Sequence, residues 1–191
     1  MTRPSVKEQI AQAGLKILLD KGFNGVGVQE ITDAAGVPKG SFYNHFESKE
    51  ALGAEIVERY GMDNTGRQVL LDRSLPALKR LRGHFEVLNE LFAKSKFERG
   101  CLLGNFSAEL SNQSAVIRHR LADLYKRWTK DIEVAIEDGQ ADGSIPRDKN
   151  AKDIAAFLLD AYEGALLRAR VERSRAPFER FMQLAFENIL A

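Results

Sequence analysis

Apolar side chains recur at helical spacing along almost the whole chain, and no other feature of the sequence constrains the fold as strongly. The clearest stripe follows Ser114 and consists of Leu121, Leu124, Tyr125, Trp128, Ile132, Ala135 and Ile136. An interval near 3.6 residues places such groups on one face of an α-helix, where they can be buried together. The periodicity therefore predicts an all-α protein.

About nine helices are predicted from this spacing and from the residues that begin and end helices. We expect them over residues 6–21, 28–35, 38–46, 48–61, 75–92, 150–173 and 177–190, with a short helix after Cys101 and a long one after Ser114. Gly22 is suited to end the first helix, whereas Ser48 and Asn150 are suited to cap later ones. Pro38 fits a first helical position, where its missing N–H costs nothing.

Composition narrows the class of protein without naming a partner. The 191 residues carry 28 basic and 27 acidic side chains, so the net charge of +1 argues neither for nor against a polyanion. No apolar run approaches the ~20 residues of a membrane-spanning helix, and the first residues do not form a secretory signal. A single cysteine, Cys101, excludes an intramolecular disulfide and fits a reducing compartment. We expect a soluble, cytoplasmic protein.

The segment VQEITDAAGVPKGSFYNHF, residues 28–46, contains two short helices joined by a turn at Gly36. A helix, a turn of three or four residues and a second helix form the arrangement that places the second helix in the major groove of DNA. The inward positions of this motif are Ile31, Ala35, Val37, Phe42 and Phe46. The second helix then keeps its hydrogen-bonding side chains for its outer face.

The outward positions of that second helix are Lys39, Gly40, Ser41, Tyr43, Asn44 and His45. Lys39, near the helix N-terminus, is the best candidate for hydrogen bonds to guanine O6 and N7. Ser41, Tyr43 and His45 can donate to phosphate oxygens, which sets the register without reading the base sequence. Gly40 lacks a side chain where the backbone could approach the duplex. The plain alternative is an amphipathic helix with no DNA partner.

The stretch AAGVPKGSFYNHFESKEAL, residues 34–52, resembles the DNA-binding signature of the tetracycline-repressor (TetR) family of bacterial transcriptional regulators. The resemblance covers about residues 5–55 closely, and the helical remainder has the family's length. It implies a homodimer with a three-helix DNA-binding domain over residues 1–50. It also implies a helical domain over residues 51–191 that binds an effector and forms the dimer.

The resemblance implies DNA contacts at Lys39, Gly40, Ser41 and Tyr43, flanked by Asn44 and His45. It further implies that Lys49, at the start of the following helix, holds a phosphate, where the helix N-terminus already favours anions. Gln29 on the supporting helix is another candidate phosphate contact. One departure concerns Gly27, since many family members start that helix with Thr or Ser and so have a hydroxyl there.

The last two helices, 150–173 and 177–190, are the expected dimer face, mainly because of the family resemblance. Small side chains on them permit close approach, and larger ones supply apolar area. The small residues are Ala161, Gly164, Ala165 and Ala185, and the large ones are Leu158, Phe178, Phe181 and Met182. The alternative is that this stripe packs inside one protomer.

A pocket for a small-molecule effector is expected between the bundle helices. Its candidate lining residues are His84, Phe85, Phe106, Tyr125, Trp128 and Phe157, although most such residues in a helical bundle belong to the core. Cys101 lies at a glycine-flanked break before a short helix, close after several basic residues. Such surroundings raise thiol reactivity, and the stretch GCLLGN resembles a TetR subgroup in which this cysteine responds to electrophiles or oxidants. The alternative for Cys101 is a small buried apolar residue.

No sequence pattern for catalysis, a metal or another cofactor is found. The three histidines are far apart and lack companion ligands, and GxSxG, HExxH and paired-carboxylate patterns are absent. We predict a homodimeric regulator of transcription, a repressor, that binds a palindromic operator and is released by an effector or by modification of Cys101. The alternatives are a helical enzyme or ligand carrier without DNA binding, and a protein-interaction adaptor.

Overall fold

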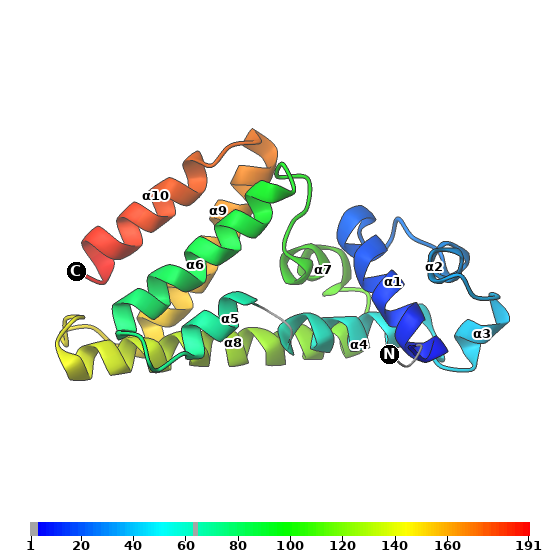
Figure 1. Ribbon diagram of the computed structural model, residues 1–191, viewed down its shortest axis with the longest axis horizontal. Helices are drawn as coiled ribbons and strands as arrows, with labels where there is room; N and C mark the ends of the chain where they lie inside the picture. The colour runs from blue at the N-terminus through cyan, green and yellow to red at the C-terminus, as the bar shows by residue number, and fades with distance from the viewer. Residues whose placement is uncertain (1–3, 63–64) are drawn as a thin grey trace. The chain divides into compact units, whose positions relative to one another are not determined.

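The computed structural model describes residues 4–62 and 65–191, and these residues form α-helices and no strand (Figure 1). The elements are α1 (Val6–Lys21), α2 (Val28–Ala35), α3 (Gly40–Tyr43), α4 (Lys49–Met62), α5 (Thr65–Leu71), α6 (Ala77–Lys94), α7 (Leu102–Leu110), α8 (Ala115–Asp142), α9 (Ala151–Glu172), α10 (Ala176–Leu184) and the π-helical turn η1 (Ala185–Ile189). The all-α prediction is confirmed. The helix that sequence reasoning missed is α5.

The described residues fall into two compact units. The first, here the N-terminal unit, comprises the chain up to residue 63 together with residues 101–124. The second, the bundle unit, comprises residues 64–100 and 125–191, so that α8 contributes to both. These packing units differ from the two functional domains that the sequence predicts, residues 1–50 and 51–191. The functional boundary at residue 50 stays a prediction.

Helices α1, α2 and α4 build the core of the N-terminal unit from apolar residues at helical spacing. Ile10 and Leu18 of α1, Ile31 of α2 and Ile56 of α4 are fully buried. Gly14 lets α1 approach α4 closely, because a Cβ atom there would lie 3.0 Å from the Ile56 side chain. Burial of these side chains supplies the main driving force for folding the unit.

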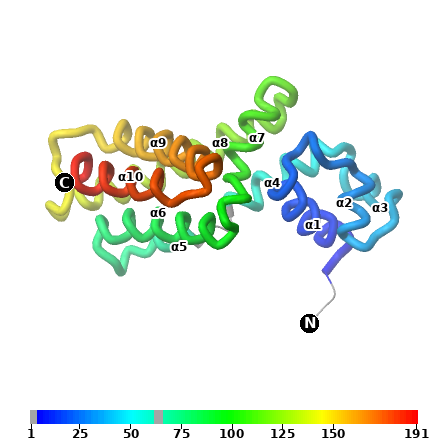
Figure 2. The backbone as a smooth tube through the Cα atoms, turned by 90° about the horizontal axis from the view of Figure 1, so that it is seen from above, coloured from blue at the N-terminus to red at the C-terminus, as the bar shows by residue number. Residues whose placement is uncertain are grey.

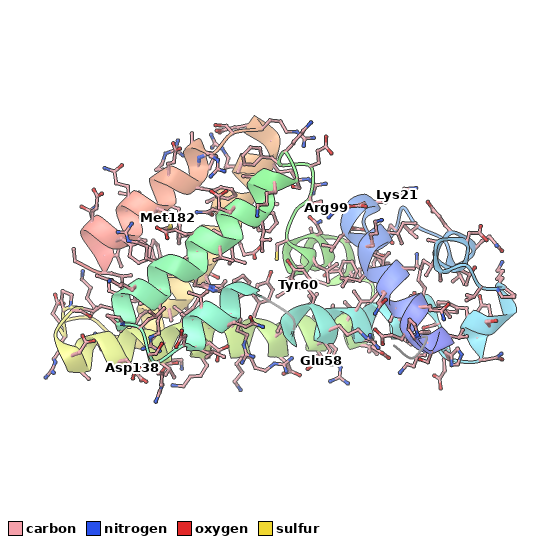
Figure 3. All side chains as sticks on the ribbon, viewed as in Figure 1. Lys21, Glu58, Tyr60, Arg99, Asp138 and Met182 are labelled. Atoms are coloured by element: carbon pink, nitrogen blue, oxygen red, sulfur yellow. The ribbon has the colours of Figure 1, made fainter. Side chains whose placement is uncertain are left out.

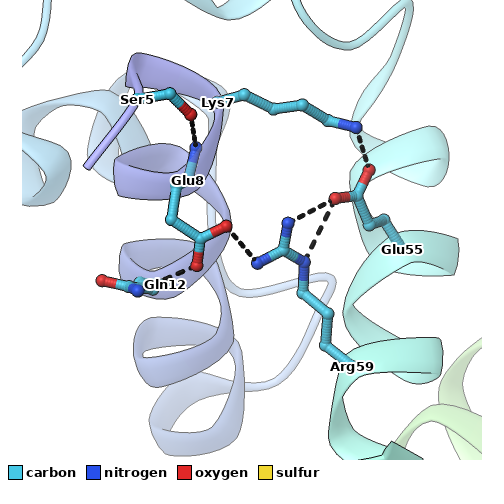
Figure 4. A network of polar contacts seen from close by, with 6 residues as sticks. All are labelled: Ser5, Lys7, Glu8, Gln12, Glu55 and Arg59. Carbon is cyan, nitrogen blue, oxygen red and sulfur yellow. Dashed lines mark hydrogen bonds and ion pairs between the residues drawn. The ribbon is translucent and has the colours of Figure 1, made fainter.

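A polar network on the surface of the N-terminal unit ties α1 to α4 (Figure 4). Arg59 donates to Glu8 at 2.7 Å and to Glu55 at 2.6 Å, and Lys7 pairs with Glu55 at 2.7 Å. The hydrogen bond from Arg59 is the main cause that lowers the pKa of Glu8. Burial raises the pKa of Glu55, but hydrogen bonds from Lys7 and Arg59 outweigh it and leave the pKa lowered. The stabilisation by these carboxylates is therefore present above their ordinary pKa and is lost as the pH falls through the lowered values.

Aromatic rings fill the core of the bundle unit, where α9 and α10 lie side by side and α6 packs against α10 (Figure 2). Phe85 of α6 is fully buried, with its ring centroid 5.1 Å from Tyr162 of α9 and 4.9 Å from Phe181 of α10. At the surface of this core, Arg80 of α6 donates to Asp138 of α8 at 2.6 Å (Figure 3 labels Asp138). Arg80 is only 4% exposed, so this contact compensates a buried charge.

Most helix ends follow the local signals in the sequence. Ser48 Oγ accepts the N–H of Ala51 at 3.1 Å, and Asn150 accepts those of residues 152 and 153. Gly22 follows α1 with a φ of 77°, a conformation that suits glycine. Pro38 is the exception, because α3 starts only at Gly40 with Lys39 as its N-cap. The expected placement of Pro38 in a first helical position is wrong, and its carbonyl instead accepts the N–H of Ser41 at 2.9 Å.

Candidate nucleic-acid interface

The turn between α2 and α3 is built on Gly36. Its φ of 67° and ψ of 33° are left-handed, and Val37 N–H returns to the Thr32 carbonyl at 3.1 Å. Thr32 is fully buried and its hydroxyl donates within α2, to the Gln29 carbonyl at 2.9 Å. This is a Schellman-like helix end, which redirects the chain sharply into α3. The helix-turn-helix arrangement expected from the sequence is thereby present.

Two buried rings anchor α3. Phe42 is fully buried and Phe46 is 4% exposed, with 5.6 Å between their ring centroids. The regular helix covers only residues 40–43. The chain beyond it stays coiled, because the N–H groups of His45 and Phe46 both donate to the Phe42 carbonyl. The two anchors match the inward positions Phe42 and Phe46 expected from the sequence.

Most of the residues expected to face outward from α3 are exposed. Tyr43 is 57% exposed, with its ring edge-on to Phe42 at 5.2 Å between centroids. Lys39, Gly40, Asn44 and His45 are exposed as well, whereas Ser41 is half-buried. A Cβ atom on Gly40 would meet no atom of the chain within 4 Å. The chain itself therefore does not require glycine at this position of α3.

The two expected contacts outside α3 are already bonded within the chain. Gln29 is exposed, but its amide donates to Asp33 on the next turn of α2 at 2.7 Å. Lys49 Nζ donates to the carbonyls of Phe23 and Val26 at 3.0 and 2.8 Å. Gly27 caps α2 with no side-chain hydrogen bond, as the sequence departure implies.

Lys49 thereby binds the α1–α2 turn, residues 22–27, a role that sequence reasoning missed. Its ammonium also lies 4.2 Å from the ring centroid of Phe23, at the distance of a cation–π contact. Phe23 is 2% exposed. An aromatic residue inside the glycine-rich turn GFNGVG was the available signal, since a ring in a turn requires a pocket to bury it. The partner of that ring could not be read from a spacing of 26 residues.

Family comparisons match most of the chain. The pattern described as "Bacterial regulatory proteins, tetR family" matches residues 10–56, and that described as "Tetracyclin repressor-like, C-terminal domain" matches residues 77–185. The chain belongs to the TetR family of bacterial transcriptional regulators. It is a DNA-binding regulator, and the family is one of regulators and not of enzymes.

The TetR regulators most useful for comparison resemble the chain over nearly its full length. The transcriptional repressor DhaR of Mycobacterium sp. strain GP1 is 41% identical over all of this chain and 95% of its own. A regulatory protein TetR from Rhodobacter sphaeroides has a TM-score of 0.88 at 33% identity, covering 95% of this chain and 97% of its own. The reduced form of Escherichia coli NemR has a TM-score of 0.89 at 29% identity, covering 97% of each chain.

The residues expected to line an effector pocket do not share one environment. Trp128 of α8 donates its indole N–H to His84 Nε2 of α6 at 2.9 Å, and His84 contacts the neighbouring ring of Phe85. Phe106 belongs to the N-terminal unit, where it packs edge-on against Phe23 at 5.6 Å between centroids. Phe157 is 54% exposed.

Phe157 lines an apolar groove of about 370 Å³ along α9, α10 and η1. Gly164, Ala165 and Leu184 are among the other residues of this groove. Leu158, Phe178 and Phe181, which the sequence assigned to the dimer face, are buried within their own protomer, and Leu158 and Phe181 also line this groove. The dimer face itself stays a prediction.

Cys101 is the N-cap residue of α7 and is 3% exposed. The phenolic O–H of Tyr60 on α4 points to its Sγ atom at 3.9 Å (Figure 3 labels Tyr60). In the part of the chain that the structure describes, no group of His, Cys, Asp and Glu could hold a metal ion. No described helix is long and apolar enough to cross a membrane.

In the bundle unit, His84 is the titratable side chain whose pKa is changed most clearly by burial. It is fully buried, and because Nε2 accepts from Trp128, the proton of the neutral ring resides on Nδ1. Burial lowers the pKa of His84 to about 4, although the Gly66 backbone and the Asp131 carboxylate act in the opposite direction. The folded state thus binds fewer protons than the unfolded chain between pH 4 and the ordinary value of 6.5.

The free energy of unfolding of the bundle unit should consequently fall as the pH drops from 6.5 toward 4. The slope approaches ~1.4 kcal/mol per pH unit for one proton. Urea unfolding followed by the fluorescence of Trp128, the one tryptophan, measures it. His84→Gln should flatten the slope in this window, whereas His119→Gln, at an exposed histidine, should leave it unchanged. Equal slopes in all three proteins would contradict the assignment.

Proposed function

We propose that this TetR-family chain is a cytoplasmic repressor that binds a palindromic operator as a homodimer, with α3 of each copy in a major groove. The exposure of Lys39, Tyr43, Asn44 and His45 on a helix anchored by buried rings carries the proposal. Two copies related by two-fold symmetry read two half-sites, which is why the operator should be palindromic. Repression is supported by the names of the relatives DhaR and NemR.

The contacting side chains divide by the chemistry they offer. Lys39 donates to guanine in the major groove and sets sequence preference. Ser41, Tyr43 and His45 donate to phosphates, with Asn44 beside them, and Gly40 lets the backbone approach the duplex. Gln29 reaches a phosphate only if its amide gives up the bond to Asp33. Selection of bound fragments from random DNA tests the proposal as a whole: enrichment of a palindrome is expected, and no enrichment would refute it.

Replacement of Lys39 and replacement of Lys49 should impair DNA binding in different ways. Lys39→Ala should relax preference at one base pair of each half-site by roughly 1–3 kcal/mol. Lys49→Met should weaken binding to every sequence alike, because it removes the bond from Nζ to the α1–α2 turn. Fluorescence anisotropy on the selected operator and on single-base variants, repeated across a salt series, measures both effects.

The salt series also tests whether Lys49 binds a phosphate. Two of its three N–H groups are used on carbonyls, so a phosphate contact would require the third. Loss of a phosphate contact lowers the salt slope by about one, whereas loss of the turn contacts alone leaves it unchanged. Lys16→Ala, at an exposed lysine of α1, is the control for a charge without either role. Identical sequence profiles for the Lys39 and Lys49 variants would contradict their assignment.

The dimer is proposed to form through the outer faces of α9 and α10. Leu167 and Val171 on α9, and Leu184 on α10, are 54%, 82% and 51% exposed, and such apolar area favours burial against a second copy. Gly164, on the groove, has no atom within 4 Å of the position of a Cβ, so a partner helix can approach closely there. The face therefore consists of the groove residues and this exposed apolar strip.

Leu184→Glu should dissociate the dimer. Placing a carboxylate in an apolar interface costs several kcal/mol, so the dimer dissociation constant should rise at least roughly 100-fold. Sedimentation velocity over a concentration series reports the change. The matched control is Leu91→Glu on α6, because Leu91 is exposed to a similar degree, 48%, away from the groove. A dimer that persists in the first variant, or dissociates equally in both, would contradict this interface.

Release from the operator is proposed to follow effector binding in the bundle unit or modification of Cys101. His84, Phe85, Tyr125 and Trp128 are the candidate effector contacts of that unit; Phe157 and Phe106 complete the set expected from the sequence. Cys101 is the N-cap residue of α7, a position where a helix N-terminus favours negative charge, and the Tyr60 O–H points at its sulfur. A bulky adduct on a side chain that is 3% exposed has to displace its neighbours.

Alkylation by N-ethylmaleimide should therefore lower the operator affinity of the wild-type protein at least roughly 10-fold, whereas Cys101→Ser should be unaffected. The chain has one cysteine, so mass spectrometry counts the adduct unambiguously. Protein that carries one adduct per chain and still binds the operator with unchanged affinity would eliminate thiol sensing. Such a result would leave effector-driven release as the mechanism.

A further inference from the structure

The α1–α2 turn is held by side chains from two other helices of the N-terminal unit, α4 and α7. Lys49 of α4 binds two of its carbonyls, and the ring of Phe23 packs against Phe106 of α7. The same ring lies so close to α4 that a Cβ atom on Gly53 would be 2.9 Å from it and 3.1 Å from Ile117 of α8. The turn is thus fixed to α4 and α7, although α7 is many residues away in the sequence.

Glu109 of α7 makes a polar contact with this turn. Its Oε2 accepts the backbone N–H of Asn24 at 2.8 Å. Its other oxygen lies against Gly22, where a Cβ atom would be only 2.6 Å away. Gly22 also has a φ of 77°, so both its conformation and its contact with Glu109 favour glycine. No local signal in the sequence joins these residues, which are about 85 positions apart.

This contact bears on the supporting helix of the DNA-binding motif. Helix α2 starts at Val28, directly after the turn, and its N-cap Gly27 offers no side-chain hydrogen bond. The direction of α2 therefore depends on how the turn is held, and α3 follows α2 after the single sharp bend at Gly36. A displacement of α7 that breaks the Asn24 contact frees one side of the turn and allows α2 and α3 to reorient together.

We propose that Glu109 is a positioning residue for DNA binding: through the Asn24 N–H it ties α7 to the turn that orients α2 and α3. The inference rests on the proposed function and deepens it, because it names a residue outside the DNA-facing surface that affinity requires. Cys101 caps the N-terminus of the helix that carries Glu109 near its C-terminus. A change at either end of α7 consequently reaches the DNA-binding motif along one rigid element.

The charge of Glu109 and its contact with the turn predict opposite effects on DNA affinity when the carboxylate is removed. Removing a carboxylate raises the net charge by one, and a less negative protein binds a polyanion more tightly. Loss of a positioning contact weakens binding instead. Asp123 is the matched control, an exposed acidic residue of α8 within the same unit. Asp123→Ala changes the charge equally without touching the turn.

The experiment compares Glu109→Ala, Glu109→Gln and Asp123→Ala by operator affinity, at a temperature where circular dichroism shows each to be fully folded. We expect roughly 5- to 10-fold weaker binding for Glu109→Ala, as for loss of a hydrogen bond to a charged acceptor near the surface. Glu109→Gln should recover to within about 2- to 3-fold of wild type, because its amide oxygen still accepts from Asn24. Asp123→Ala should bind as tightly as wild type or slightly more tightly.

Amide exchange at Asn24 provides a second readout that involves no DNA. The Asn24 amide should exchange faster in Glu109→Ala than in wild type, and Glu109→Gln should restore its protection. Unchanged affinity in Glu109→Ala despite faster exchange overturns the proposal, as does a Glu109→Gln variant as weak as Glu109→Ala. If exchange is unaltered in Glu109→Ala, the contact does not hold the turn and the proposal also fails. Absence of DNA binding by the wild-type protein would instead refute the proposed function, and the exchange result would still stand.

Discussion

Burial of Phe42 and Phe46 is the interaction on which the proposed DNA-binding surface depends. A helix of four residues cannot form alone, because its nucleation cost exceeds the gain from so few hydrogen bonds. The two rings hold it in place, since both are at least 96% removed from solvent while the side chains between and around them stay exposed. Stability and the proposed function thus depend on different faces of one short segment, because the exposed residues do not contribute to the core.

A second layer of contacts positions that segment from a distance. The α1–α2 turn receives an ammonium from α4, a ring from α7 and a carboxylate from the same helix. Each contact joins residues that are distant in sequence, and none of them faces the proposed duplex through α3. Lys49 shows that residue type alone does not identify every partner: a lysine at a helix start suits a phosphate, and its ammonium also donates to two backbone carbonyls. These intramolecular partners are set by tertiary packing.

Local signals made most helices and helix ends predictable, and long-range contacts were the part that sequence reasoning could not supply. Ser48, Asn150 and Gly22 act where their chemistry indicates, because caps and left-handed ends involve only neighbouring residues. The segment TGRQVLL of α5 is too short for a helical period to be evident, and its pairing with α6 is tertiary. The outward face of α3 was predicted because two aromatic anchors determine it. The contacts of Lys49 and Glu109 could not be predicted, because nothing local specifies a partner 26 or 85 residues away.

The space around a glycine distinguishes positions packed within the protomer from positions on the surfaces proposed to contact a second molecule. A helical glycine costs about 1 kcal/mol relative to alanine. At Gly14 and Gly53 the chain itself explains that cost, because neighbouring side chains lie where a Cβ atom would be. Gly40 on α3 and Gly164 on α9 have no neighbour within 4 Å, so nothing inside the protomer requires them. One lies on the proposed DNA surface and the other on the proposed dimer groove, and in both places close approach by a second molecule would explain a residue without a side chain.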